Sequence, residues 1–209
     1  MTDRGPSGLT PHELQNQASW DADSDAYQER HGNELADSGG VAWGTTQIPE
    51  SELRVLGDVA GKDILELGCG AAQWSIGLAK LGARPVGIDL SERQLEHARR
   101  LQDAAGVSFP LIHASAENVP LPDASFDIVF CDHGAMTFAD PYRTVPEAAR
   151  LLRPGGLFAW NSRIHSPYGS WKVVVSPSSR RCIPKYGTTN RSVTRSPSSG
   201  QAIASIGVW

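Results

Sequence analysis

Cysteine is scarce in this 209-residue sequence: only Cys69, Cys131 and Cys182 are present, and they lie far apart. An odd number of cysteines at such distances gives neither a disulfide framework nor the close pairs of a zinc site, so we expect no metal. Long apolar runs are also missing, and none approaches the roughly 20 residues that a membrane-spanning helix needs. No apolar segment of a secretory signal follows the first eight residues. These absences favour a cytoplasmic protein without a membrane partner.

Acidic residues are missing from the last part of the chain. Residues 1–161 hold all 23 acids and 12 bases, a net charge of −11, whereas residues 162–209 hold seven bases and no acid. That last segment also contains 11 serines and four prolines, a composition that buries too little apolar area to offset the entropy of ordering. Within it, the runs at 171–175 and 202–206 could form short strands. The segment lacks a clustered recognition pattern, so we expect no nucleic-acid partner.

Strand-like and helix-like patterns alternate before residue 162. Each apolar run is nearly continuous and is separated from the next by a helical pattern or a loop, as is typical of a parallel sheet covered on both faces. We therefore expect a Rossmann-like, doubly wound, mainly parallel α/β sheet in three α/β/α layers. The predicted strands are 63–67, 85–90, 109–113, 127–131 and 157–160, and the predicted helices are 71–81, 91–105 and 141–152.

Two helices carry local signals of their own. Ser91 is a helix-capping residue, and Gln94 three positions later completes a capping box. In the helix before it, Trp74, Leu78 and Leu81 recur at helical spacing, which predicts one buried face.

The candidate site lies where the first two predicted strands end, because ligands of open α/β sheets bind beyond the carboxyl ends of the strands. Gly68 and Gly70 allow a tight turn and a close approach to a ligand. Asp89 ends the second strand about 20 residues later, where a carboxylate can accept hydrogen bonds from both hydroxyls of a ribose. A pyrophosphate site would favour glycine at position 73, but the chain has Gln73 there. The pattern indicates a nucleoside ligand without a phosphate.

Five ordered motifs extend this pattern, and through them the chain resembles the class I S-adenosylmethionine-dependent methyltransferases, in particular their type 11 small-molecule branch. The resemblance covers residues 55–161, which implies an S-adenosylmethionine-binding core there. Residues 19–23, with Tyr27 and His31, resemble the N-terminal helix that covers the cofactor in some members, so residues 1–54 are expected to form a helical lid segment and 162–209 an irregular basic tail. The motifs are 64–70, 87–91, 114–122, 125–129 and 151–156.

The resemblance implies S-adenosyl-L-methionine as cofactor and assigns roles around the first two strands. Gly68 and Gly70 would pass along its methionine part. Cys69 lies between them among the cofactor-binding residues, with a thiol that fills space rather than reacts. Glu66 would lie beneath this loop and bind backbone amides or the amino group of the methionine part. Asp89 would hold the ribose hydroxyls, and the residue after it, Leu90, would pack near the adenine ring.

Further roles follow for later strand ends. Ser115, Ala116 and Glu117 match the segment that lies along the adenine edge. Members often carry Asp where this chain has Ser115, so the acceptor for the adenine amino group is not accounted for. Asp132 and His133 match the region that faces the methyl group and the acceptor. Asp132 would contact the cofactor, and either residue could act in catalysis, His133 as a base or simply as a wall of the pocket.

Aromatic residues near the N-terminus leave two interpretations open. Trp20, Tyr27 and Trp43 could wall an acceptor pocket, or they could serve packing alone.

The resulting functional hypothesis is transfer of a methyl group to a small-molecule acceptor, with in-line displacement that depends mainly on orientation. A base is required only if the acceptor must lose a proton. The alternative is a degenerate, non-catalytic relative, because the family's last antiparallel strands are expected to be missing or irregular after a frameshift or truncation near residue 162. The acceptor, the atom methylated and the oligomeric state stay open.

Overall fold

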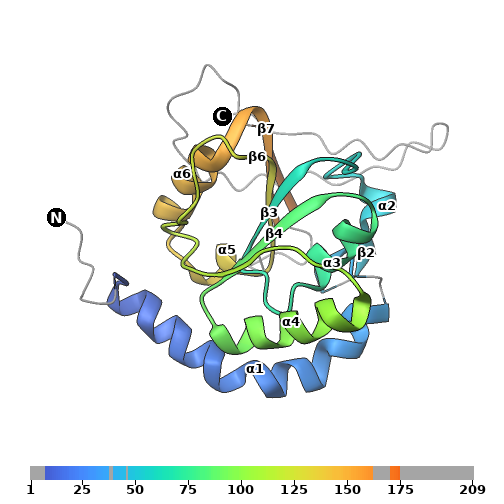
Figure 1. Ribbon diagram of the computed structural model, residues 1–209. Coiled ribbons are helices and arrows are strands. Elements are labelled where there is room, and N and C mark those ends of the chain that lie inside the picture. The colour runs from blue at the N-terminus through green and yellow to red at the C-terminus, as the bar shows by residue number, and fades with distance from the viewer. Residues whose placement is uncertain (1–7, 38–39, 46, 162–169, 175–209) are drawn as a thin grey trace.

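The computed structural model describes residues 8–37, 40–45, 47–161 and 170–174 (Figure 1). Helices and short strands alternate along the chain around one six-stranded sheet. The elements are α1 (Pro11–Asp37), β1 (Ala42–Trp43), β2 (Ile48–Pro49), α2 (Glu50–Leu53), β3 (Asp63–Leu67), α3 (Gln73–Lys80), β4 (Arg84–Asp89), α4 (Glu92–Ala105), β5 (Leu111–His113), β6 (Phe126–Asp132), α5 (Ala135–Phe138), α6 (Pro141–Leu151), β7 (Leu152–Asn161) and β8 (Ser170–Val174).

The main sheet has the order β5-β4-β3-β6-β7-β8, and its first five strands are parallel. The chain starts at the centre with β3, moves outward to β4 and β5, and then crosses to β6 on the other side of β3. This reversal of direction between β3 and β6 is the point at which α/β sheets bind ligands. Helices cover both faces, and the predicted Rossmann-like α/β fold is confirmed.

All five predicted strands are present: β3 has the predicted bounds, β4 and β6 differ by one residue at each end, and β5 and β7 differ by more. β5 begins at Leu111, because Pro110 has no amide hydrogen to donate to the ladder. β7 begins earlier than predicted, at Leu152, but its pairing with β6 shifts register between Phe126 and Ile128, whose partners are Leu152 and Leu157. The intervening turn in β7 includes Gly155 at a φ of 81°.

The edge strand β8 changes one expectation for the C-terminal segment in part. The last antiparallel strands were expected to be missing or irregular, and one such strand is present: residues 170–174 pair antiparallel with β7 in a continuous register. The run at 171–175 was one of the two possible strands in this segment, and β8 covers most of it. The second run at 202–206, Cys182 and the frameshift hypothesis lie outside the described residues.

The core follows the two-residue period of the strands. In β3, Ile64 belongs to a cluster on one face of the sheet, whereas Leu65 and Leu67 belong to the cluster on the other face. The same alternation separates Ile128 from Val129 in β6. Alternate side chains of one strand point to opposite faces, so each central strand contributes to both cores.

Helix α4 confirms one half of the predicted capping box. The Ser91 hydroxyl accepts a hydrogen bond from the Gln94 amide at 3.1 Å. The side chain of Gln94 does not return to Ser91, because it accepts from Gln28 at 3.1 Å, and the Ser91 amide donates to Asp89 at 2.8 Å. In α3, Trp74 and Leu78 are buried as predicted, but Leu81 follows the helix and is 56% exposed.

The long helix α1 begins with a signal that sequence reasoning missed. Thr10, Pro11 and Glu13 form a capping box with proline at the first helical position: the Thr10 amide donates to Glu13 Oε2 at 2.6 Å, and the Glu13 amide donates to Thr10 Oγ1 at 3.2 Å. Figure 1 shows α1 running alongside α4. Although α1 has 27 residues, neither it nor another helix in the described ranges is apolar enough to cross a membrane.

Candidate functional site

The loops after β3 and β4 meet at the carboxyl edge of the sheet, where the sequence predicted a site. Asp89, the last residue of β4, accepts hydrogen bonds from the Gly70 amide through Oδ2 and from the Ser91 amide through Oδ1, each at 2.8 Å. Burial raises the pKa of this carboxyl, although the two amides oppose that effect. The structure therefore brings Gly70 and Asp89 together as the motif spacing predicted.

Gly68 adopts a left-handed conformation, with a φ of 69°, which glycine tolerates at no steric cost. Its loop also passes close to the turn after β6. A Cβ at Gly68 would lie 2.4 Å from the amide nitrogen of Ala135, and a Cβ at Gly134 would lie 2.2 Å from the carbonyl oxygen of Gly68. The turns after β3 and β6 thus touch backbone to backbone. Both positions need glycine, and together they fix the floor of the site at the centre of the sheet.

Glu66 lies in β3 beneath this loop, and its contacts are to the start of α3. Its Oε2 accepts from the Ser75 amide at 3.1 Å and from the Ser75 hydroxyl at 2.5 Å. α3 has no side-chain cap of its own, since Ala72 precedes it at a φ of 57°. Glu66 therefore satisfies an amide of the first helical turn. Burial raises the pKa of Glu66 to about 8.

Asp132 joins three elements at the end of β6. It accepts hydrogen bonds from the Gly44 amide at 3.1 Å, from the Trp74 indole at 3.3 Å and from the Asn161 side chain at 3.0 Å. Burial raises the pKa of Asp132, while the neighbouring His133 and these donors work against the rise. Asp132 is thus held firmly by the turn after β1, by α3 and by β7. Its catalytic role stays a prediction.

His133 follows Asp132 in an unusual backbone conformation, with a φ of 59°. A non-glycine residue in this region is uncommon and often marks a functional turn. The His133 amide donates to the Asn161 carbonyl at 2.9 Å, and its Nε2 lies 3.5 Å from the Asn161 side chain. His133 thus lies beside Asp132 at the end of β6, and its role at the acceptor stays a prediction.

The thiol of Cys69 is buried beneath the site rather than displayed in it. Cys69 packs with Ala72, Leu95 and Ala98. A Cβ on Gly87 would approach its sulfur to 2.9 Å. Burial raises the pKa of the thiol well above its ordinary value, so the thiol stays protonated and unreactive. If Cys69 contacts a ligand, its backbone is the part that does so.

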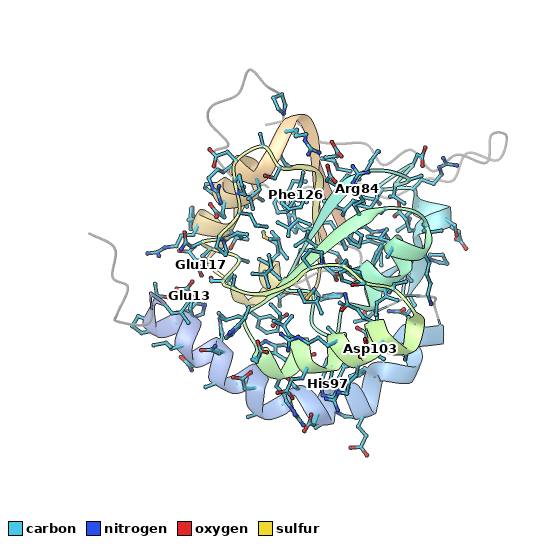
Figure 2. All side chains as sticks on the ribbon, in the orientation of Figure 1. Glu13, Arg84, His97, Asp103, Glu117 and Phe126 are labelled. Carbon is cyan, nitrogen blue, oxygen red and sulfur yellow. The ribbon has the colours of Figure 1, made fainter. Side chains whose placement is uncertain are left out.

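The segment after β5 lies beside Asp89, since the Ala114 amide donates to the Asp89 carbonyl at 3.0 Å. Ala116 is buried, and Glu117 accepts from the Asp140 amide at 3.0 Å, which links this segment to the start of α6. The Ser115 hydroxyl donates to Glu13 of α1 and accepts from the Glu117 amide at 3.1 Å. Figure 2 labels Glu13 and Glu117 at this end of α1.

Polar contacts hold α1 across the strand ends. Gln17 donates to the carbonyl of Leu90 at 3.1 Å, and Ser91 donates to Asp21 at 2.6 Å. Farther along, Asp25 pairs with Arg93 at 2.8 Å. The N-terminal segment, whose helical character the family resemblance implied, thus lies over the loops that were predicted to bind the cofactor.

A second stripe of α1 carries aromatic residues. The Trp20 ring stands edge-on to Tyr27 and to Phe138 of α5, with centroids 5.5 Å and 5.1 Å apart. Trp43 has a different environment: it is 2% exposed and packs on Trp74 in the core. Of the three aromatic residues that could wall a pocket, Trp20 and Tyr27 remain candidates, whereas packing explains Trp43.

The donor set at this edge fits S-adenosylmethionine. The loop from Gly68 to Gly70 presents backbone without side-chain bulk, apart from the buried Cys69. Three carboxyl groups lie at or near the strand ends: Glu66 is buried, and Asp89 and Asp132 are half-buried. A ligand with two positive centres, a sulfonium and an ammonium group, is suited to the carboxylates of Asp89 and Asp132. Asp89 has the position and chemistry to hold a ribose.

Known proteins resemble this chain over the same region. Residues 65–160 match the family model described as a methyltransferase domain. The demethylmenaquinone methyltransferase of Listeria welshimeri is 33% identical over 131 residues, 61% of this chain and 56% of the relative. The ubiquinone biosynthesis O-methyltransferase of Aromatoleum aromaticum is 42% identical over 99 residues, 47% of this chain and 42% of the relative. The chain spans about half the length of these curated relatives.

A solved structure supports the fold independently. A proposed S-adenosyl-L-methionine-dependent methyltransferase from Methanococcus maripaludis superposes with a TM-score of 0.58 at 17% identity, covering 68% of this chain and 63% of that one. The sheet order, the ordered motifs and the matched domain agree. Residues 65–160, just under half of the chain, thus match a methyltransferase domain, and the sheet around them has the fold of the S-adenosylmethionine-dependent methyltransferases.

Proposed function

We propose that this protein transfers the methyl group of S-adenosylmethionine to a small-molecule acceptor at the carboxyl edge of its sheet. The observation that carries the proposal is the junction of Asp89 with Gly70, which places a carboxylate against a glycine loop at the switch point of the sheet. When bound there, the cofactor would supply a methyl group on a sulfonium, from which the neutral thioether S-adenosylhomocysteine leaves readily.

The residues of the site then act by position and charge. Asp89 accepts hydrogen bonds from the ribose hydroxyls, and the amides of Gly70 and Ser91 keep its carboxylate in place. Glu66 keeps the start of α3 in place beneath the loop. Asp132 holds the turn after β1 against β7, and its negative charge favours a cationic ligand nearby. Orientation of this kind can lower a barrier by roughly 7–11 kcal/mol in favourable cases.

The acceptor would lie between α1 and the turn after β6. The rings of Trp20, Tyr27 and Phe138 form its apolar side, and His133 stands at the strand end. One relative is named a demethylmenaquinone methyltransferase and another a ubiquinone biosynthesis O-methyltransferase, and aromatic rings suit a planar acceptor such as a quinone. His133 would serve as a base for a hydroxyl acceptor and as a wall for one that needs no deprotonation.

Calorimetric titration of the full chain with S-adenosylmethionine and S-adenosylhomocysteine tests the proposal. We expect micromolar binding, weakened about 10–100-fold by Asp89→Ala, because hydrogen bonds to a charged group contribute about 1.5–3 kcal/mol. Asp103→Ala removes an exposed acid from α4 and serves as the matched control, with no expected change. A folded wild-type protein that gives no binding heat would support the non-catalytic alternative and contradict the proposal.

A further inference from the structure

We propose that Asn161, the last residue of β7, holds neutral His133 in the tautomer that carries its hydrogen on Nδ1, so that His133 meets the methyl acceptor as a hydrogen-bond donor. The inference rests on the proposed function and adds a positioning residue to its site. Asn161 and Asp132 are register partners at the ends of β7 and β6, and His133 follows Asp132 directly. The side chain of Asn161 contacts both of the other side chains.

The orientation of the Asn161 side chain follows from the partners of Asp132. The Gly44 amide lies 3.1 Å from both carboxylate oxygens, and the Trp74 indole nitrogen lies 3.3 Å from Oδ2. A backbone amide and an indole only donate hydrogen bonds, so the oxygens of Asp132 act as acceptors. The Asn161 atom that lies 3.0 Å from the Asp132 carboxylate is therefore its amide nitrogen and not its oxygen.

The same nitrogen decides which ring nitrogen of His133 carries a hydrogen. Asn161 Nδ2 lies 3.5 Å from His133 Nε2, which makes this a long hydrogen bond. An amide nitrogen has two hydrogens and accepts none, so it donates one to Asp132 and turns the other toward His133. A hydrogen on Nε2 would face this second N–H, whereas a lone pair on Nε2 accepts it. In a neutral imidazole the hydrogen then lies on Nδ1.

Backbone contacts keep the two side chains together. Asn161 is 8% exposed, and its carbonyl accepts a hydrogen bond from the His133 amide at 2.9 Å. A Cβ on Gly44 would lie 2.7 Å from Asn161 Nδ2 and 3.7 Å from His133 Nε2. Glycine at position 44 therefore lets the turn after β1 pack against the pair. Asn161 holds His133 through its main chain and through its side chain.

This tautomer narrows the chemistry of the methyl acceptor. Among the residues that the structure describes, no partner is present for His133 Nδ1, and the side chain is half-buried. The N–H at Nδ1 can donate to a carbonyl oxygen or to an oxyanion, whereas the lone pair that could remove a proton is occupied by Asn161. A hydroxyl acceptor would first have to displace Asn161 from Nε2. We therefore expect an acceptor with a carbonyl or an already ionised oxygen, such as an enolate.

Nitrogen NMR of the full chain with isotope-labelled histidine tests the inference, because protonated and unprotonated ring nitrogens have widely separated shifts. At about pH 9, above the ordinary pKa of histidine, we expect a protonated Nδ1 and an unprotonated Nε2 for His133 in the wild type. Asn161→Leu has nearly the same shape but no donor, and it should move the His133 population toward the form with its hydrogen on Nε2. His133→Gln assigns the signals by their loss. Asn118→Ala removes an exposed asparagine and serves as the matched control, with no expected change.

The spectrum of the wild type can overturn the inference without any variant, since a hydrogen on Nε2 of neutral His133 contradicts it. An unchanged tautomer in folded Asn161→Leu would contradict it as well, because the side chain of Asn161 would then have no part in the choice. Titration calorimetry with S-adenosylhomocysteine keeps the two proposals apart. A wild type that binds this ligand but has its hydrogen on Nε2 refutes only the inference. One with the expected tautomer that gives no binding heat refutes the proposed function, and with it the role of His133 at an acceptor.

Discussion

The carboxylates at the amino ends of the strands (the amino edge of the sheet) and those at the carboxyl ends (the carboxyl edge) have different kinds of partner. At the amino edge, Arg153 pairs with Asp63 and with Asp127, each at 2.8 Å, and Arg84 pairs with Asp63 at 2.7 Å. Hydrogen bonding from Arg84 holds the pKa of Asp63 below its usual value. Figure 2 shows Arg84 on the side of the molecule away from α1. Charges at this edge are already balanced within the protein.

At the carboxyl edge, neutral donors hold the carboxylates. Backbone amides bind Asp89, the Ser75 amide and hydroxyl bind Glu66, and an amide, an indole and a side-chain amide bind Asp132. Burial raises the pKa of all three groups. The comparison teaches that arginines balance the carboxylates at the amino ends of the strands, whereas the raised pKa values at the carboxyl ends leave groups whose ionised forms a positively charged ligand would favour.

The largest expected effect that sharpens this comparison is the pH dependence that Glu66 gives to the free energy of unfolding. Its folded pKa of about 8 exceeds the unfolded value of 4.5, so the folded state binds a proton that the unfolded state releases between these pH values. The free energy of unfolding therefore falls as pH rises through this window, by roughly 3–5 kcal/mol from this group. Urea unfolding of wild type and Glu66→Gln from pH 5 to about 8.5 measures it.

Glutamine keeps an oxygen for the Ser75 donors but cannot ionise, so the free-energy difference between variant and wild type should shift in favour of the variant as pH rises. A difference that is constant over the whole pH range would contradict the assignment of this carboxyl as the base-sensitive group.

The smallest expected effect comes from breaking the amino edge. Arg153→Ala removes the pairs to Asp63 and Asp127. The arginine side chain is 39% exposed, and solvent-exposed pairs contribute little. We expect the urea midpoint at pH 7 to move only slightly and the affinity for S-adenosylhomocysteine to stay unchanged.

Arg153→Ala should change the loss of stability at low pH more clearly than it changes stability at pH 7. Asp63 has a lowered folded pKa, so its contribution to stability is present above the unfolded value and is lost as pH falls through the folded one. Acidification should therefore lower the free energy of unfolding of Arg153→Ala by less than it lowers that of the wild type. A large loss of ligand affinity in Arg153→Ala would contradict the claim that the amino edge takes no part in ligand binding.

Local sequence patterns predicted the parts of the fold that depend on local physics. The central strands are apolar enough to be recognised alone, and the loop of Gly68 and Gly70 with Asp89 follows from motif spacing. β8 was visible only as a short apolar run, because its pairing with β7 is a long-range event. The capping box of Thr10 and Glu13 is also a local signal, but it was not used to predict the start of α1.

The contacts of the site were harder to foresee. Asp132 receives donors from Gly44, Trp74 and Asn161, which are 88, 58 and 29 residues away. Glu13 reaches Ser115 across 102 residues. Neither grouping has a sequence period, because the topology alone brings these residues to one edge.

Hydrogen–deuterium exchange of the full chain with and without S-adenosylhomocysteine tests the central claim most directly, since ligand contacts reduce local opening. The account predicts protection of α1 and of the loops that follow β3, β4, β5 and β6, with no change at the amino ends of the strands. Protection centred on the loops that precede β4 and β6, or no protection in the presence of saturating ligand, would contradict it.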